Sequence, residues 1–169
     1  MFSAGEHIIY SIFGVCLVEK IAASPVDPSS EQLYYYLRPV SAKTNNFICI
    51  PKDNPSLPMR TLITEKELEN LVPEIRKDRY LTVASEKNRR DVYKTAIMSL
   101  DPLQYLRLIF TVESRRENFF KSKKRLPETD IEFERTAKNS LYHEIELVRN
   151  IPFEQVNDFV HTLFAQPEE

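Results

Sequence analysis

The sequence predicts an α+β protein with two domains. A small N-terminal β-barrel of the SH3-like or Tudor-like type (residues 1–62) is followed by an all-α bundle of about five helices (residues 63–169). Two observations predict this organisation. Short apolar runs bounded by Pro, Ser, Asp and Asn fill the first 62 residues, as is typical of strands. From Thr64 onward the apolar residues recur at a helical spacing instead.

Five strands are expected in the N-terminal domain. The first two are rich in Ile, Val and Leu and are separated by a turn at Phe13-Gly14, and the third alternates between two faces. Pro51 ends the fourth strand, because proline has no amide hydrogen to donate to a sheet. The expected strands are His7–Ile12, Val15–Ile21, Gln32–Val40, Phe47–Ile50 and Met59–Leu62.

Five helices are expected in the C-terminal domain, each with a start signal in the sequence. Two of the signals are capping boxes, and a third combines an N-cap acid with proline at the first helical position. The apolar face of the third helix is expected to extend as far as Phe120. The start signals are Thr64-Glu65-Lys66-Glu67, Ser85, Asp101-Pro102-Leu103-Gln104, Thr129-Asp130-Ile131-Glu132 and Asn150-Ile151-Pro152.

The net charge of −2 conceals a strong asymmetry along the chain. Residues 1–62 are neutral, residues 63–125 carry a net charge of +5, and residues 126–169 carry −7. A basic segment of this kind favours an anionic partner. The acidic side chains of the last segment are expected to be solvated on exposed helix faces, namely Glu132, Glu134, Glu144 and Glu146.

The sequence contains no arrangement typical of an active site or a cofactor site. Phosphate-binding loops, zinc-protease motifs, nucleophile elbows and CxxC pairs are all absent, and the three histidines are scattered over separate elements. Cys16 and Cys49 are expected to be reduced thiols of a cytoplasmic protein. No run approaches the roughly 18 apolar residues of a membrane span. We therefore expect a protein that is not an enzyme and has no metal, cofactor, membrane or small-molecule substrate.

Two basic clusters are the strongest functional candidates, one at the start of the second helix and one at the end of the third. Each also fits a solvated helix face, and cations at a helix C-terminus suit the helix dipole. As DNA-binding residues they would contact phosphates, which orient a protein without reading the base sequence. The candidates are Lys87, Arg89, Arg90, Lys94, Arg115, Arg116, Lys121, Lys123 and Lys124.

Laid end to end, short motifs of this chain resemble the CarD (CdnL) family of bacterial RNA polymerase-binding transcription regulators, whose N-terminal domain is similar to the polymerase-interacting module of the transcription-repair coupling factor. The resemblance covers nearly the whole chain and depends on the order and spacing of the motifs. The family's Ser-Gly-Asp helix start is similar to Ser99-Leu100-Asp101 here. The other matching stretches are Phe2, Gly5-Glu6, Ile8-Ile9-Tyr10, Gly14, Tyr34-Tyr35-Tyr36-Leu37, Ile48-Cys49-Ile50-Pro51, Met59-Arg60, Arg89-Arg90, Leu126-Pro127, Ala137, Leu141 and Glu144-Ile145.

The resemblance implies that the barrel binds the polymerase β subunit and that the helical domain binds promoter DNA upstream of the melted region, which modulates open-complex stability. Three departures stand out. Cys16 stands where the family has a second glycine. Ser24 and Cys49 occupy positions where the family places basic side chains, and Lys87 stands where the family has a tryptophan. A lysine offers charge but no flat ring to place against bases. The polymerase-binding candidates are Ser24, Tyr34, Tyr36, Arg38, Ile48, Cys49 and Ile50.

Two other classes of function remain open. The chain could be a protein-interaction module that binds polymerase without DNA contact, which the missing tryptophan favours and the basic clusters oppose. Alternatively, the barrel could bind single-stranded nucleic acid with Tyr34, Tyr36 and Phe47 as stacking platforms. The neutral charge of residues 1–62 opposes that second alternative.

Overall fold

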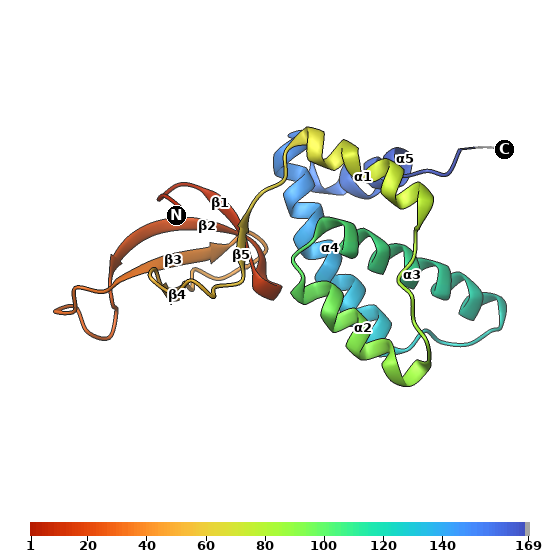
Figure 1. Ribbon diagram of the computed structural model, residues 1–169, viewed down its shortest axis with the longest axis horizontal. Helices are drawn as coiled ribbons and strands as arrows, with labels where there is room; N and C mark the ends of the chain where they lie inside the picture. Colours follow the sequence, from red (N-terminus) through yellow and green to blue (C-terminus); the bar gives the residue numbers. More distant parts are fainter. Residues whose placement is uncertain (168–169) are drawn as a thin grey trace. The chain divides into compact units, whose positions relative to one another are not determined.

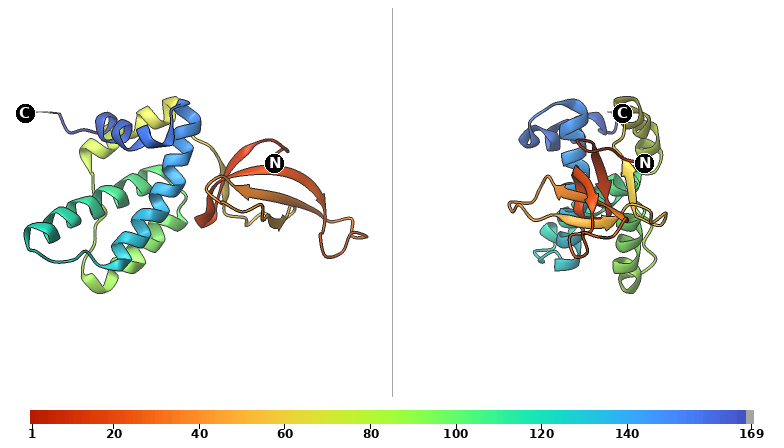
Figure 2. Two further views of the ribbon diagram at one scale, coloured as in Figure 1. Left: turned by 180° about the vertical axis from the view of Figure 1, so that it is seen from behind. Right: turned by 90° about the vertical axis from the view of Figure 1, so that its left-hand side faces the viewer.

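The computed structural model describes residues 1–167 and divides the chain into two compact units, Met1–Leu62 and the residues from Ile63 onward. The fold class is α+β, as predicted. The first unit contains a five-stranded antiparallel sheet, and the second contains five α-helices within the described residues (Figures 1 and 2). As far as residue 167, no helix combines the length and the apolar character that crossing a membrane requires.

The sheet contains the five strands expected from the sequence, in the order β4-β3-β2-β1-β5. Every neighbouring pair is antiparallel. β4 and β5 are the two edges of the sheet, which is therefore open. The strands are β1 (His7–Tyr10), β2 (Gly14–Ala23), β3 (Leu33–Pro39), β4 (Ile48–Pro51) and β5 (Met59–Thr61), with the 3₁₀ turn η1 (Ser11–Phe13) between β1 and β2.

One face of the sheet carries the core of this unit, because successive side chains of a strand point to opposite faces. In β3, Tyr35 and Leu37 are buried in the core as expected, and Tyr34 and Arg38 stay partly exposed. The burial does not alternate along the whole strand, because Tyr36 is buried outside this core and Leu33 is exposed. Gly14 begins β2 with φ 70°, a conformation that favours glycine. The buried members of this core are Ile8, Cys16, Val18, Tyr35, Leu37 and Ile50.

Three of the five helices begin where the sequence predicts. The capping box at Thr64 is present: its hydroxyl accepts from the Glu67 N–H at 3.1 Å, and the Glu67 carboxylate accepts from the Thr64 N–H at 2.7 Å. Asp101 caps its helix by accepting from the Leu103 N–H at 2.9 Å. Ser85 holds the N-cap position without a side-chain hydrogen bond. The helices are α1 (Glu65–Lys77), α2 (Glu86–Met98), α3 (Pro102–Lys121), α4 (Glu128–Arg149) and α5 (Phe153–Leu163).

Two predicted start signals are wrong. α4 begins at Glu128, directly after Pro127, so that Thr129 lies inside its first turn and caps nothing. Asn150 ends α4 instead of starting α5, with a left-handed φ of 52°, and α5 follows Pro152. A proline directly precedes both helices. Its missing amide hydrogen is no loss there, because the first amides of a helix have no partner within the helix.

α3 lies at the centre of the helical core. From Tyr105 to Val112 every residue except Arg107 is buried, which is the pattern of a helix surrounded by other helices. The surrounding helices each contribute buried apolar residues, notably Leu68 and Ile75 (α1), Tyr93 and Ile97 (α2), Ala137, Leu141 and Ile145 (α4), and Val156 and Val160 (α5).

We predict that Thr64→Ala lowers the free energy of unfolding by about 1 kcal/mol, because the first amides of α1 lose their capping acceptor. Urea denaturation followed by far-ultraviolet circular dichroism measures this difference. Ser85→Ala is the matched control, since Ser85 occupies the same cap position of α2 without a side-chain hydrogen bond. We expect a change below about 0.5 kcal/mol there. Equal losses in the two variants would contradict the capping role of Thr64.

Candidate nucleic-acid interface

Two of the predicted DNA-binding arginines belong to a closed ring of hydrogen bonds that joins α2, α3 and α4. Asp130, in the first turn of α4, is fully buried, and its carboxylate accepts from the Tyr93 hydroxyl at 2.7 Å and from Arg115 Nε at 2.9 Å. Arg115 also donates to Glu86 at 2.9 Å. Arg89 completes the ring by donating to Glu86 at 2.8 Å and to the Tyr93 hydroxyl at 3.0 Å.

The ring exists because a buried carboxylate is costly unless the protein supplies it with charge and hydrogen bonds. Burial, and secondly the hydrogen bond to Asp130, raise the pKa of Tyr93 to about 12 against the opposing effect of Arg89, so that the phenol stays a donor. The side chains of Arg89 and Arg115 are only 13% and 15% exposed. Moving either to a DNA phosphate would remove a partner from this ring.

Arg116 is held in a second network between α3, α4 and α5. Its guanidinium donates to Glu134 at 3.0 Å, and Glu134 also pairs with Lys138 at 3.0 Å. Lys138 pairs with Glu113 at 3.3 Å, which in turn meets His161 Nε2 at 2.9 Å. Burial by itself would raise the pKa of Glu134, but Arg116 and Lys138 outweigh it and hold the pKa below its usual value. Glu134 therefore stays ionised and keeps Arg116 in place.

The prediction that the acids of α4 are solvated is wrong for Glu134 and Glu144. Glu134 is 5% exposed, and Glu144 is completely buried and accepts from the backbone N–H of Ile63 at 2.8 Å. Only Glu132 and Glu146 keep contact with solvent. A three- and four-residue spacing returns to the same helix face, and both buried acids fall on the apolar face of α4. Their carboxylates serve as internal acceptors.

The exposed face of α2 carries cations that remain available. Lys87, Arg90 and Lys94 are exposed, and none of them forms an ion pair with another residue in the part of the chain that the structure describes. Asp91 lies on the same exposed side and reduces the local positive charge. Arg89 was predicted to belong to the same basic cluster. Neighbouring residues of a helix point in different directions, however, and the side chain of Arg89 is turned toward the core.

The second basic cluster divides in the same way. Arg115 and Arg116 are both paired with acidic side chains of α4, although the side chain of Arg116 is 45% exposed. Lys121, Lys123 and Lys124 are exposed at the end of α3 and just beyond it. Lys121 forms a solvent-exposed pair with Glu117 at 2.9 Å. The structure therefore separates the available cations into two groups, one along α2 and one at the C-terminal end of α3 (Figure 1).

Phe120 does not lie on the buried apolar face of α3, so the expectation from the helical period is wrong for this residue. Its side chain is 81% exposed. The reason is the position of α4: Arg115 meets Asp130 in the first turn of α4. The last turn of α3 therefore extends past the start of α4 and the neighbouring helices (Figures 1 and 2). The helical period of α3 alone does not reveal where its partner helix begins.

The predicted polymerase-binding residues divide between the core and the surface of the sheet. Ile48 and Ile50 pack in the sheet core, so that only their backbone is available to a partner. Tyr36 is 8% exposed, lies between Lys20 and Phe47, and donates its hydroxyl hydrogen to the Ala23 carbonyl at 2.8 Å. This burial removes Tyr36 as a stacking platform.

The remaining candidates lie at least partly at the surface. Arg38 pairs with Glu19, which leaves it less free to meet a partner. The Ser24 hydroxyl accepts hydrogen bonds from two amides of the following loop, both at 3.2 Å. Tyr34 and Cys49 are half-buried. These four side chains provide little free charge for binding a partner. The backbone of β4 is therefore the stronger candidate for a binding surface on the sheet.

The outer edge of β4 presents unpaired backbone groups. The Lys52 N–H donates to the Leu33 carbonyl at 2.8 Å, which sets the direction of bonding toward β3. In an edge strand, the backbone N–H and C=O groups of every second residue point toward the neighbouring strand. Those of Ile48 and Ile50 therefore point toward β3, as those of Lys52 do, and those of Cys49 point away from the sheet. Such an edge can accept a strand from a partner.

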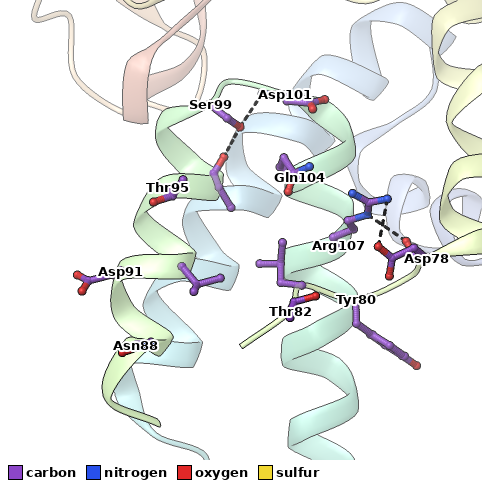
Figure 3. A pocket seen from close by; sticks show the side chains of 13 residues that line it. Asp78, Tyr80, Thr82, Asn88, Asp91, Thr95, Ser99, Asp101, Gln104 and Arg107 are labelled. Carbon is purple, nitrogen blue, oxygen red and sulfur yellow. Dashed lines mark hydrogen bonds and ion pairs between the residues drawn. The ribbon is translucent and has the colours of Figure 1, made fainter. Parts of the chain in front are cut away.

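A groove of about 870 Å³ opens between α2, α3 and the segment before α2 (Figure 3). Its charged lining residues are Asp78, Asp91, Asp101 and Arg107, and Arg107 is paired with Asp78 at 3.6 Å. One paired cation among three acids does not favour a phosphate ligand. No cluster of three or more potential metal ligands occurs between residues 1 and 167. The groove is therefore not part of the candidate interface.

No model of a protein family matches this chain, and no curated protein matches it either.

We predict that Arg115→Ala lowers the free energy of unfolding by about 3–5 kcal/mol, because it leaves the buried Asp130 carboxylate without its cation. Lys124→Ala removes the same charge from an exposed position and should change stability by less than about 0.5 kcal/mol. Urea denaturation of both variants measures the difference. A mild effect of Arg115→Ala would show that the ring around Asp130 is dispensable and would return Arg115 to the DNA-binding candidates.

Proposed function

We propose that the protein is a cytoplasmic transcription regulator of the CarD type. In this proposal residues 1–62 form a small, partly open Tudor-like barrel that binds the RNA polymerase β subunit, and the helical unit is a separate domain that binds the backbone of promoter DNA. A protein that binds both changes the population of the open promoter complex according to its difference in affinity for the open and closed states.

The backbone conformation at three of the family's glycine positions carries the proposal, whereas Cys16, at a fourth such position, lies inside β2 without a positive φ. Gly5 and Gly14 have φ values of 86° and 70°. Leu100 stands where the family has the glycine of its Ser-Gly-Asp helix start, and its φ is 56°. This left-handed conformation costs most residues roughly 1–2 kcal/mol and favours glycine. Leu100 thus has the left-handed conformation expected of a glycine, at the position where the family motif has one. This agreement supports the alignment of Ser99-Leu100-Asp101 with the family's Ser-Gly-Asp motif.

The open edge of β4 supports the polymerase half of the proposal. Backbone hydrogen bonds to an added strand do not depend on the side chains of the edge. Binding of this kind tolerates Ser24 and Cys49 in place of the family's basic residues. The contribution of Tyr34, half-buried on the face opposite the core, is then secondary.

The exposed cations of α2 support the DNA half of the proposal. Lys87, Arg90 and Lys94 form one exposed row and need no rearrangement to meet phosphates. Lys121, Lys123 and Lys124 form the second available group. Such contacts give affinity without sequence preference.

One observation favours a second function, that of a protein-interaction module without DNA contact. Arg89, Arg115 and Arg116 are three of the nine predicted DNA-binding residues, and each of them donates hydrogen bonds to an acidic side chain of the protein. This reduces the positive charge available to DNA. The salt dependence of DNA binding decides between the two functions.

We predict that the full-length protein binds immobilised RNA polymerase β subunit and that Cys49→Pro weakens this binding roughly tenfold, by removing an outward-facing N–H from the β4 edge. Biolayer interferometry measures the affinity. Cys49→Ala controls for the side chain, and Thr61→Pro makes the equivalent change on the β5 edge; both should bind like the wild type. Wild-type affinity of Cys49→Pro would exclude the β4 edge, and absence of binding by the wild type would refute the polymerase half of the proposal.

We predict that duplex DNA binding weakens with salt and that replacing Lys87, Arg90 and Lys94 by Gln flattens the slope of log affinity against log salt by about 2 to 3 units, since each lost phosphate contact removes about 0.9. Fluorescence anisotropy of a labelled duplex over a salt series gives the slope. The matched control replaces Lys66, Arg76 and Lys77 of α1 by Gln, an equal loss of charge among exposed residues. Equal flattening in both variants would exclude a specific role of α2, and no salt-dependent binding at all would favour the interaction module.

A further inference from the structure

The end of α3 carries an exposed aromatic ring next to a group of cations. We define the α3 tip as residues Phe120–Arg125. Phe120 is 81% exposed, although the preceding Phe119 is half-buried and packs against the helical core. Four of the six tip residues are cationic and none is acidic. The ring of Phe120 therefore does not pack against the helical core.

The backbone of the α3 tip is well defined by the end of the helix. The Lys124 N–H donates to the Phe119 carbonyl at 2.9 Å, and the Lys123 N–H donates to the Phe120 carbonyl at 3.0 Å. These two bonds form a Schellman motif, in which the residue after the cap takes a left-handed conformation that favours glycine. That residue is Lys123, with φ 54°. A cation therefore occupies a position where glycine would be less strained.

The charges of the α3 tip are accessible. Lys121 and Arg125 are 67% and 87% exposed, and they pair with the exposed Glu117 and Glu128, respectively. Pairs of this kind contribute little to stability and yield easily to another anion. Lys123 and Lys124 are exposed and have no ion pair with any residue from 1 to 167.

We propose that the α3 tip binds single-stranded nucleic acid, with the ring of Phe120 stacked on an unpaired base and the cations on the flanking phosphates. This inference rests on the proposed function, in which the helical unit lies near melted DNA. Aromatic stacking combined with cations is the usual way in which proteins hold single strands. In this proposal the α3 tip supplies the aromatic ring that is missing at Lys87 on α2.

An anionic membrane surface is the other partner that cations and an exposed ring would suit. Segments that bind membranes bury a broad apolar face in the lipid. Phe120 is the only exposed apolar residue of the α3 tip, and the rest of it is strongly polar. A single flat ring surrounded by cations fits a base between phosphates better than a lipid layer.

The test measures the affinity of the full-length protein for labelled oligo(dT) and for a blunt duplex by fluorescence anisotropy. Phe120→Ala should weaken binding to oligo(dT) between about 5-fold and 150-fold and change duplex affinity by less than about twofold. Tyr80→Ala removes another exposed aromatic ring of the helical unit and should change neither affinity. If Phe120→Ala leaves oligo(dT) affinity unchanged while duplex binding persists, the tip proposal is refuted and the proposed function stands. If the wild type binds neither probe, the tip proposal and the DNA half of the proposed function are refuted together, while the polymerase half is still tested by binding to the β subunit.

A fluorescence measurement tests stacking directly, because the chain contains no tryptophan. Phe120→Trp should keep its oligo(dT) affinity, and its indole emission should be quenched by oligo(dT) but not by the duplex. The emission of Tyr80→Trp should respond to neither. Equal quenching in both variants would contradict stacking at the α3 tip.

Lys123→Gly separates folding from binding. It should raise the midpoint of thermal unfolding by about 4 °C, because it relieves the left-handed position, and flatten the salt slope for oligo(dT) by about 0.7. An unchanged slope would exclude Lys123 as a phosphate contact. Vesicles containing phosphatidylserine give the remaining outcome: binding that depends on Phe120 there, with oligo(dT) affinity unaffected, would overturn the proposal in favour of a membrane surface.

Discussion

The helical unit depends on a buried negative charge, the carboxylate of Asp130. Once this group is removed from water, the protein has to supply its hydrogen-bond donors, and these come from Tyr93 on α2 and Arg115 on α3. One side chain of α4 thereby joins three helices. Since the pairing with Arg115 takes place in the first turn of α4, it also sets where α4 begins along α3, and it leaves the last turn of α3 uncovered.

The same constraint changes the meaning of the charge asymmetry in the sequence. The basic middle and the acidic end of the chain suggested a cationic surface for an anionic partner. In the structure, part of that asymmetry is neutralised internally: Arg115 pairs with Asp130, and Arg116 with Glu134. Of the predicted DNA-binding cations, those that face solvent without an internal partner among residues 1–167 lie in two separate places, the exposed face of α2 and the α3 tip.

The sheet unit offers a different kind of binding feature, which resides in its backbone more than in its side chains. The apolar residues of β4 are turned into the core, and the charge of Arg38 is paired with Glu19. What β4 presents outward is a short row of amide and carbonyl groups, which any extended partner can meet. Binding through such an edge depends little on which side chains the edge carries.

The sequence by itself determined the fold class, the strands and the starts of α1, α2 and α3, because these follow from local periodicity and from capping chemistry at residues such as Thr64 and Asp101. It also identified the cationic positions. Only the tertiary structure decided which of them are available. Arg89 and Arg90 are neighbours with the same charge, yet one faces Glu86 and Tyr93 and the other faces solvent. The burial of Glu144 and the exposure of Phe120 depend on where other helices lie. That information is non-local, because a helical period defines a face but not the helix that covers it.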